Sequence, residues 1–258
     1  MKRQPKLLVF AGAGISVDSG LPTFRRTVED DASTTFWGDA SIYDVCSYAA
    51  WEQAKIAPND GYVRRIENFY AKMWDDIRKA EPNSFHHLIA EVIRKNLYDV
   101  QVVTTNVDDL FEKAGIPESR VLHLHGSILH RRCMICGSVY VFQPHSEDVD
   151  QCPDPTCLSK MVKTDVTFYG EACTEYAKGI EAFNALEKDD CILMAGSSGE
   201  TFTDAMVLWS ECRRRDVRTI HINPHYYPHI IYFADVNLRC GIRDTIPFLR
   251  KTLKIDSI

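Results

Sequence analysis

The sequence predicts an α/β fold, in which helices cover both faces of a parallel β-sheet. The chain has 258 residues and 45% of them are hydrophobic, which is enough for one large domain or for a large domain with a small one. Several segments are short, rich in β-branched residues and apolar almost throughout, as strands buried on both faces are. Helical segments separate these strands, and this alternation favours a doubly wound sheet.

The strands are expected at residues 6–11, 99–104, 190–195 and 217–223. The clearest helix is predicted by PNSFHHLIAEVIRKN, where Asn83 or Ser84 can cap a segment whose apolar residues recur at helical spacing. Further helices are expected at 60–78, 109–114, 181–188, 201–215 and 245–253.

Two stretches interrupt this alternation. Residues 26–58 are polar and aromatic without a clear period, and together with the long helix after them they predict a helical insertion at 26–80. Residues 128–163 combine cysteines with weak strands such as SVYVF and predict a second, smaller insertion. Residues 1–258 are therefore expected to form a single domain that carries two insertions.

The charge of the chain argues against nonspecific binding of nucleic acid, because the formal net charge is −6. One basic cluster, Arg213 to Arg215 with Arg218, is better explained by a solvated helix end. No apolar run approaches the ~18 residues of a membrane helix. Residues 7–13 follow a basic start and imitate a short signal peptide, but a buried first strand explains them better. We expect no direct nucleic-acid partner, no membrane association and a monomer.

The cysteines indicate a reducing compartment and a metal site. A secreted disulfide framework would be denser than nine cysteines, an odd number, in 258 residues, so we expect a cytoplasmic protein. Four of them have the spacing Cys133-x2-Cys136-x15-Cys152-x4-Cys157. Two close pairs of thiolates suit a tetrahedral zinc ion, whereas four unrelated thiols or two disulfides are the alternatives. Four thiolates leave no open coordination position, so the zinc ion is expected to be structural.

A glycine loop follows the first expected strand in KLLVFAGAGISVDSG and looks like a phosphate-binding turn. The fingerprint G-x-G-x-x-G/A, however, requires a small residue where Val17 stands. It also requires an acidic residue at the end of a second strand, and residues 29–44 contain no such strand. MAGSSGET resembles a second phosphate cradle, and two cradles suit a ligand with two phosphates. The ligand is therefore not held as in an ordinary dehydrogenase.

Two other loops carry polar side chains at expected strand ends. In TTNVDDLFEKAG, Asn106 and Asp108 can read a carboxamide by complementary hydrogen bonds, or they can cap the helix at 109–114. In VLHLHGS, His123 and His125 are expected to share one face of a strand. One imidazole can serve as a general base near neutral pH, and a hydrogen-bonded histidine at a strand end is the structural alternative.

Taken together and in order, these stretches resemble the sirtuin family of NAD-dependent protein deacylases. The resemblance spans roughly residues 7–250 and is most specific in the first glycine motif and in the cysteine spacing. The matching segments are Gly12 to Ser16, Ser19 to Arg25, Pro82-Asn83 with His86, Thr104 with Asn106 to Asp108, His125-Gly126, the four cysteines, DVTFYGE at 165–171, Gly196 to Ser198 and Ile222-Asn223.

The resemblance implies a Rossmann-like sheet and an enzyme that cleaves nicotinamide from NAD and transfers an acyl group from a lysine of a protein or peptide to ADP-ribose. It implies that Asn106 and Asp108 hold the carboxamide, and that His125 acts as base on a ribose hydroxyl. It also implies that part of the insertion at 26–80 is a loop that binds the cofactor. The implied NAD-binding residues are Gly12, Ala13, Gly14, Ile15, Ser16, Thr23, Phe24, Arg25, Thr105, Asn106, Val107, Asp108, Gly196, Ser197, Ser198, Asn223 and Ile242. The implied substrate-binding residues are Tyr70, Val166, Phe168, Gly170 and Glu171.

Several residues depart from the family pattern. Thr105 replaces the glutamine of T-Q-N-I-D, and Gly199 replaces a leucine. Thr164 replaces the proline before the substrate strand. Met73 stands where members that remove acidic acyl groups carry arginine, so a neutral acyl group is expected. An NAD glycohydrolase or ADP-ribosyltransferase on the same scaffold is the alternative, and a non-catalytic NAD-sensing module is a third class.

Overall fold

The computed structural model describes residues 3–23, 42–56, 60–144, 151–199 and 205–256. Its main sheet has six strands, all parallel, in the order β3-β2-β1-β7-β8-β9. The chain order reverses between β1 and β7, which is the arrangement of a Rossmann-like doubly wound sheet. The strands are β1 Lys6–Ala11, β2 Asp99–Thr104, β3 Val121–His123, β7 Cys191–Ala195, β8 Arg218–Ile222 and β9 Val236–Leu238.

Strand β1 shows why the sheet is covered on both faces. Leu7, Val9 and Ala11 pack into one hydrophobic core, whereas Leu8 and Phe10 pack into another, because successive side chains of a strand point to opposite faces. The four strands predicted from the sequence are confirmed to within one residue at each end.

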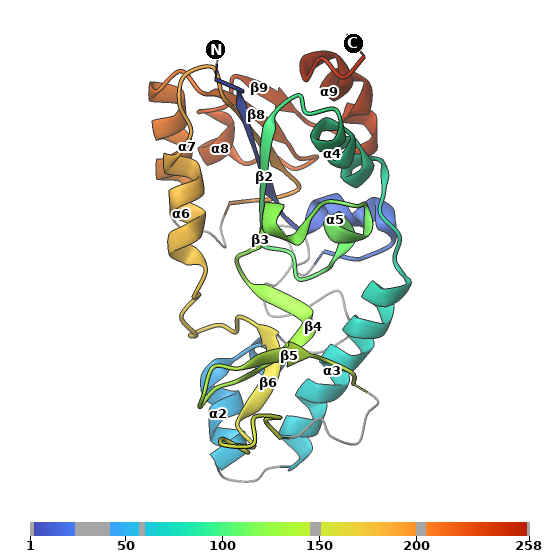
Figure 1. The fold of residues 1–258 in the computed structure, drawn as a ribbon, viewed down its shortest axis with the longest axis vertical. Coiled ribbons are helices and arrows are strands. Elements are labelled where there is room, and N and C mark those ends of the chain that lie inside the picture. The colour runs from blue at the N-terminus through green and yellow to red at the C-terminus, as the bar shows by residue number, and fades with distance from the viewer. Residues whose placement is uncertain (1–2, 24–41, 57–59, 145–150, 200–204, 257–258) are drawn as a thin grey trace.

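Helices cover each face of the sheet (Figure 1). Helices α4 Ser84–Arg94 and α9 Ile246–Thr252 contribute to the core on one face. Helices α6 Tyr176–Asn184, α7 Ala205–Arg214 and α8 Pro228–Ile231 contribute to the core on the other. The side chain of Asn83 caps α4 as predicted, since its Oδ1 accepts from the amide of Phe85 at 3.0 Å. Short helices complete the main part: α5 Leu110–Lys113 and the 3₁₀ turns Ala13–Ser19, Glu118–Arg120 and Arg243–Thr245.

A second, smaller part lies at the lower end of the molecule in Figure 1. It combines an antiparallel sheet of order β5-β4-β6 with the helices of the 26–80 stretch. Its core includes Trp51, Tyr70, Met73, Ile128 and Phe168. The two stretches predicted as insertions therefore pack on one another. The elements are α1 Ile42–Val45, α2 Tyr48–Ile56, α3 Asp60–Lys79, β4 Gly126–Cys133, β5 Val139–Val141 and β6 Val162–Val166.

Arg213 and Arg214 end α7 and Arg215 follows it, as predicted, whereas Arg218 begins β8. The guanidinium of Arg215 donates to three carbonyl oxygens near the end of α6, those of Phe183, Asn184 and Leu186. This arginine is therefore engaged in joining two helix ends. Among the helices that the structure describes, none is both long enough and apolar enough to cross a membrane.

Candidate functional site

The two glycine loops lie against each other at the carboxyl ends of β1 and β7, where the chain order of the sheet reverses. The amide of Gly14 donates to the carbonyl oxygen of Gly196 at 2.9 Å. A Cβ on Gly12 would lie 2.7 Å from that oxygen, and a Cβ on Gly196, whose φ is +62°, would lie 2.4 Å from the amide nitrogen of Ile15. Glycine is therefore needed here for contact between two backbones, and ligands of such sheets bind beside this point.

Asn83 holds the first glycine loop in place. Its Nδ2 donates to the carbonyl oxygen of Ile15 at 2.7 Å and to the hydroxyl of Ser19 at 3.0 Å, while its Oδ1 caps α4. The amide of one side chain thus joins the start of α4 to the 3₁₀ turn after β1.

Asn106, Asp108 and Ser16 form a buried polar cluster, with 7%, 8% and 2% of their surfaces exposed. The Ser16 hydroxyl donates to Oδ2 of Asp108 at 2.9 Å, and Nδ2 of Asn106 donates to Oγ of Ser16 and to the carbonyl oxygen of Gly12, both at 3.2 Å. Oδ1 of Asp108 also accepts from the amide of Leu110 at 3.2 Å, so Asp108 caps the start of α5 as well. Burial raises the pKa of Asp108, against the lowering effect of the Ser16 hydrogen bond.

One acceptor in this cluster is left over. Oδ1 of Asn106 is buried and has no hydrogen-bond partner in the part of the chain that the structure describes. Because an unpaired buried acceptor is costly, a donor from a bound molecule would be stabilising there. A primary amide of a ligand has such a donor, so the donor set of this cluster fits a carboxamide.

The two histidines do not share a strand face, which corrects the prediction. Strand β3 ends at His123, and His125 lies in the turn before β4. The chain turns there because Gly126 has a φ of +76° and no room for a side chain: a Cβ would lie 2.0 Å from the carbonyl oxygen of Asp165. The ring of His123 is bonded to the carbonyl oxygen of Asn106 and to Glu112, whereas His125 lies half-buried beyond the strand.

The expected substrate residues gather around β6. Tyr70 from α3 is fully buried and stacks on Phe168, with ring centroids 5.5 Å apart. Oε2 of Glu171 accepts from the amide of Phe168 at 2.9 Å and lies 3.0 Å from Nζ of Lys163. Val166 is buried at the end of β6. The 166–171 segment is therefore held in shape by an ion pair.

The sequence reasoning missed Lys163 and Glu112. Lys163 is a lysine inside an otherwise buried strand, and such a residue needs an opposite charge nearby, which is a usable signal. Glu112 carries no comparable signal, because a glutamate on a short helix is most often solvated.

The remaining predicted cofactor residues surround the two loops. Nδ2 of Asn223 donates to the carbonyl oxygen of Ser197 at 3.1 Å. The carbonyl oxygen of Ser198 lies 3.1 Å from Nε2 of His229. The Thr105 hydroxyl lies 3.4 Å from the carbonyl oxygen of Ala11. Ala13 begins the 3₁₀ turn and Thr23 ends the first described segment. Val107 packs against the core of the smaller part, and Ile242 lies in the sheet core that contains Leu7 and Val9. Phe24 and Arg25 lie outside the described residues.

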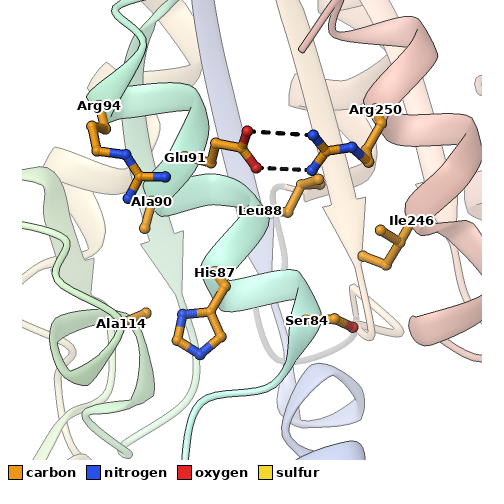
Figure 2. Close-up of a pocket in the computed structure, with 9 residues that line it drawn as sticks. All are labelled: Ser84, His87, Leu88, Ala90, Glu91, Arg94, Ala114, Ile246 and Arg250. Carbon is orange, nitrogen blue, oxygen red and sulfur yellow. Dashed lines mark hydrogen bonds and ion pairs between the residues drawn. The ribbon is translucent and has the colours of Figure 1, made fainter. Parts of the chain in front are cut away.

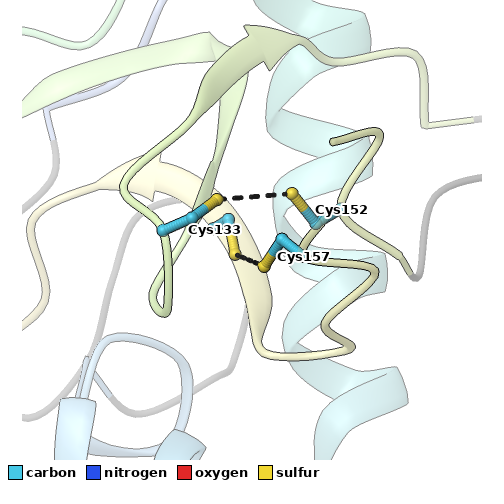
Figure 3. A group of neighbouring side chains, drawn as sticks. Cys133, Cys152 and Cys157 are labelled. Atoms are coloured by element: carbon cyan, nitrogen blue, oxygen red, sulfur yellow. Dashed lines mark hydrogen bonds between the residues drawn. The ribbon is translucent and has the colours of Figure 1, made fainter. Parts of the chain in front are cut away.

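The four predicted metal ligands come together (Figure 3). Their sulfur atoms all lie within 4.8 Å of one another, with 3.7 Å between Cys133 and Cys157 and 3.6 Å between Cys136 and Cys152. A tetrahedral zinc ion with Zn–S bonds of about 2.3 Å separates its sulfurs by about 3.8 Å. A disulfide would instead need about 2.05 Å. The donor set and the spacing fit zinc.

A cavity of about 330 Å³ lies elsewhere, against α4 and α9 (Figure 2). Glu91 and Arg250, which both line it, form a two-point ion pair, with Nη1–Oε2 and Nη2–Oε1 distances of 2.8 and 3.3 Å. None of the predicted site residues that the structure describes lines this cavity, so it is not the candidate site.

Known proteins resemble this chain over most of its length. The Sir2 family model matches residues 12–203. The NAD-dependent protein deacylase of Helicobacter hepaticus is 31% identical over 247 residues, 88% of each chain, and that of Thermococcus kodakarensis is 31% identical over 256 residues, 96% of this chain and 90% of its own.

Solved structures of Sir2 proteins share the fold of this chain. A Sir2 homologue in complex with NAD has a TM-score of 0.77 at 24% identity, covering 98% of this chain and 90% of its own. A structure described as addressing the mechanism and regulation of Sir2 enzymes has a TM-score of 0.73 at 27% identity, covering 97% and 93%. With the family match and relatives above 30% identity, the chain belongs to the Sir2 family, the sirtuins.

Proposed function

We propose that this protein is an NAD-dependent protein-lysine deacylase that prefers acetyl or another neutral acyl group. It would cleave nicotinamide from NAD and transfer the acyl group to ADP-ribose. The observation that carries the proposal is the unpaired, buried Oδ1 of Asn106 beside Asp108 and the two glycine loops. The relatives support it, because those of Helicobacter hepaticus and Thermococcus kodakarensis are named NAD-dependent protein deacylases.

The residues around the glycine loops would bind NAD. When bound, NAD supplies a ribose carbon that is activated toward attack. Asn106 would accept a hydrogen bond from the nicotinamide carboxamide, and Asp108 would orient the Asn106 amide through the Ser16 hydroxyl. Gly12 to Ser16, Thr105 and Val107, with Thr23, Phe24 and Arg25, would enclose one half of the dinucleotide. Gly196 to Ser198, Asn223 and Ile242 would hold the other half.

His125 would act as the general base. It lies in the tight turn that Gly126 imposes, outside the strand and half-buried, and its main-chain oxygen is held by the amide of Thr167 at 2.9 Å. An imidazole so placed can accept a proton from a ribose hydroxyl near neutral pH.

The acyl-lysine substrate would bind along the 166–171 segment. Val166, Gly170 and Glu171 would offer backbone groups to a peptide strand, while Tyr70 and Phe168 would line the floor beneath the acyl group. The apolar cluster around that floor favours a neutral acyl group.

The four cysteines would bind one structural zinc ion. Cys133, Cys136, Cys152 and Cys157 fill a tetrahedral coordination sphere, so the ion would take no part in the chemistry. We also propose the boundaries of the parts: a catalytic domain over 1–258, a zinc module at 128–163 and an insertion that carries helices and a cofactor loop at 26–80.

We further propose that the protein is a cytoplasmic monomer without a direct nucleic-acid partner. The four metal-ligand thiols and the other five cysteines form no disulfide in the structure, which suits a reducing compartment. The negative net charge supports the absence of a nucleic-acid partner.

An NAD glycohydrolase or ADP-ribosyltransferase is the second candidate. It is favoured by Thr105, which stands in place of a long amide and whose hydroxyl lies beside a main-chain oxygen of β1. Nicotinamide release measured with and without acyl-lysine peptides distinguishes the two. We expect release to depend on the peptide, and release that is equally fast without any peptide would favour the glycohydrolase.

A further inference from the structure

A histidine ring joins the proposed nicotinamide-binding segment to helix α5. His123 ends β3 and only 17% of its side chain is exposed. Its Nδ1 lies 2.9 Å from the carbonyl oxygen of Asn106, and its Nε2 lies 2.9 Å from Oε1 of Glu112. Both ring nitrogens thus face oxygen atoms, on opposite sides of the ring.

The proton count follows from these two neighbours. A carbonyl oxygen only accepts hydrogen bonds, so Nδ1 must carry a proton. An ionised carboxylate also only accepts, so with Glu112 ionised Nε2 carries a proton as well, and the ring is then an imidazolium. A neutral ring would turn the bare lone pair of Nε2 toward the carboxylate oxygen of Glu112.

Among the described residues, His123 is the only ion-pair partner of Glu112. Its Oε2 is buried and has no hydrogen-bond partner among the described residues. The titratable groups that face the ring are Glu112 on α5 and Asp108 in the loop after β2, while β2 itself pairs with His123 through Thr104. Asp109, the next acid along the chain, lies 3.2 Å from Nζ of Lys113. His123 is therefore the cation that offsets the negative charge at this place.

The pKa of His123 agrees in direction. Burial lowers it, but the hydrogen bond to Glu112 and the charges of Glu112 and Asp108 outweigh burial, so that the pKa lies above its ordinary value. A raised pKa means that the charged ring is fully present below the ordinary imidazole value and is lost as the pH rises through the raised value.

We propose that His123 is a positioning residue: as a buried imidazolium between the Asn106 carbonyl and Glu112, it fixes the segment that carries Asn106 and Asp108 and so sets the affinity of the site for NAD. This inference rests on the function proposed above and extends it. His123 touches no substrate, and its effect passes through the backbone of Asn106.

The test measures NAD binding by calorimetry at several pH values from acid to alkaline, in the wild type and in three variants. In the wild type, affinity should fall as the ring loses its proton. In His123→Gln, affinity at neutral pH should fall roughly tenfold or more, as for loss of one charge-assisted hydrogen bond. In Glu112→Gln the amide can donate to a neutral Nε2, so the alkaline fall should disappear. His87→Gln, an exposed histidine on α4, is the matched control and should behave as the wild type.

Nitrogen NMR of histidine-labelled protein gives a second measurement, with His123→Gln to assign the signals. Both ring nitrogens of His123 should be protonated at neutral pH. A neutral ring there, or the same alkaline fall in Glu112→Gln as in the wild type, would overturn the inference. If the wild type binds NAD and the variants match it, only the role of His123 is wrong. If the wild type fails to bind NAD, the proposed function falls too.

Discussion

Ser16 decides how the amide of Asn106 is oriented. A serine hydroxyl has one proton, and here it goes to Asp108, so Oγ can only accept from Asn106. The carbonyl oxygen of Gly12 also only accepts, and the Nδ2 of Asn106 must therefore face both of them. Oδ1 is then the atom left for a ligand, which is why three polar residues together form a more specific site than any one of them alone.

Substitution of either Asn106 or Asp108 should weaken the binding of nicotinamide. We expect Asn106→Ala and Asp108→Asn each to raise the inhibition constant of nicotinamide roughly tenfold and to slow turnover, because each loses one hydrogen bond to or near the carboxamide. Melting temperature should change little in Asp108→Asn, since an asparagine can still cap α5. Unchanged nicotinamide inhibition in both variants would mean that the carboxamide is held elsewhere.

His125 and His123 should differ in which kinetic constant they control. His125→Ala should lower formation of deacylated product by about a hundredfold to ten-thousandfold, the range for loss of a general base, while NAD binding stays nearly intact. His123→Ala should instead weaken NAD binding and leave turnover of the bound substrates less affected. Product formation and NAD affinity, compared at equal folded concentration, check this. An inactive His123→Ala beside an active His125→Ala would refute the catalytic assignment.

Met73 should exclude acidic acyl groups. It is 2% exposed in the apolar cluster with Tyr70 and Phe168, and the ammonium of Lys163 is already paired with Glu171. A succinyl carboxylate would therefore be buried without a cationic partner, which is costly. We expect kcat/KM for an acetyl-lysine peptide to exceed that for the succinyl peptide roughly tenfold or more, and Met73→Arg to narrow the gap. Faster succinyl removal by the wild type would point to Lys72, Arg64 or Arg65 as the partner.

At the scale of elements, what the sequence could predict depended on local signals. Strands β1, β2, β7 and β8 and helices α3, α4 and α7 were predictable because apolar period and capping residues are properties of neighbouring positions. Strands β3 and β9 have three residues each, which is too short for a period. The turn at His125 depends on the approach of Gly126 to Asp165, thirty-nine residues later in the chain, and no local pattern reports it.

The candidate site shows the same limit. Glycine motifs, the four cysteines and the loops after the strands could be read from spacing, because each is a short run. The links between them could not: Ser16 to Asp108, His123 to Glu112 and Lys163 to Glu171 are contacts between separate segments that only the folded chain brings together.

The contact between the glycine loops predicts the cost of a side chain there. Gly196→Ala should destabilise the protein by at least about 2 kcal/mol more than Gly115→Ala, measured by denaturant unfolding. Both glycines have positive φ, +62° and +92°, so both variants carry the strain of about 1–2 kcal/mol for that conformation. Only at Gly196 would the new Cβ meet backbone, 2.4 Å from the nitrogen of Ile15, whereas it meets nothing within 4 Å at Gly115. Equal losses would show that the loops can separate.

On the scale of the whole molecule, the small sheet supports the 166–171 segment, which we propose binds the substrate. Strand β4 begins directly after the turn of His125 and ends at Cys133, and β6 leads into the 166–171 segment. Arg131 on β4 pairs with Glu67 on α3, and its guanidinium lies 4.7 Å from the centre of the Phe142 ring. These strands therefore join the cysteine cluster to the 166–171 segment and to the turn of His125, so the cluster contributes to the stability of this whole part.

Loss of zinc should thus destabilise the protein without a direct effect on the chemistry. Cys152→Ser removes one of four ligands and should lower the bound metal from about one zinc per chain to a small fraction, together with a loss of about 3 kcal/mol or more in unfolding free energy. Cys240→Ser is the matched control, because Cys240 lies outside the cluster and should keep both the metal and the stability. Metal analysis, chemical unfolding and nicotinamide release per folded molecule check this, and the last quantity should stay close to that of the wild type in both variants. A purified, folded wild type without stoichiometric metal would refute the prediction, because the fold would then not need an ion between the four thiols.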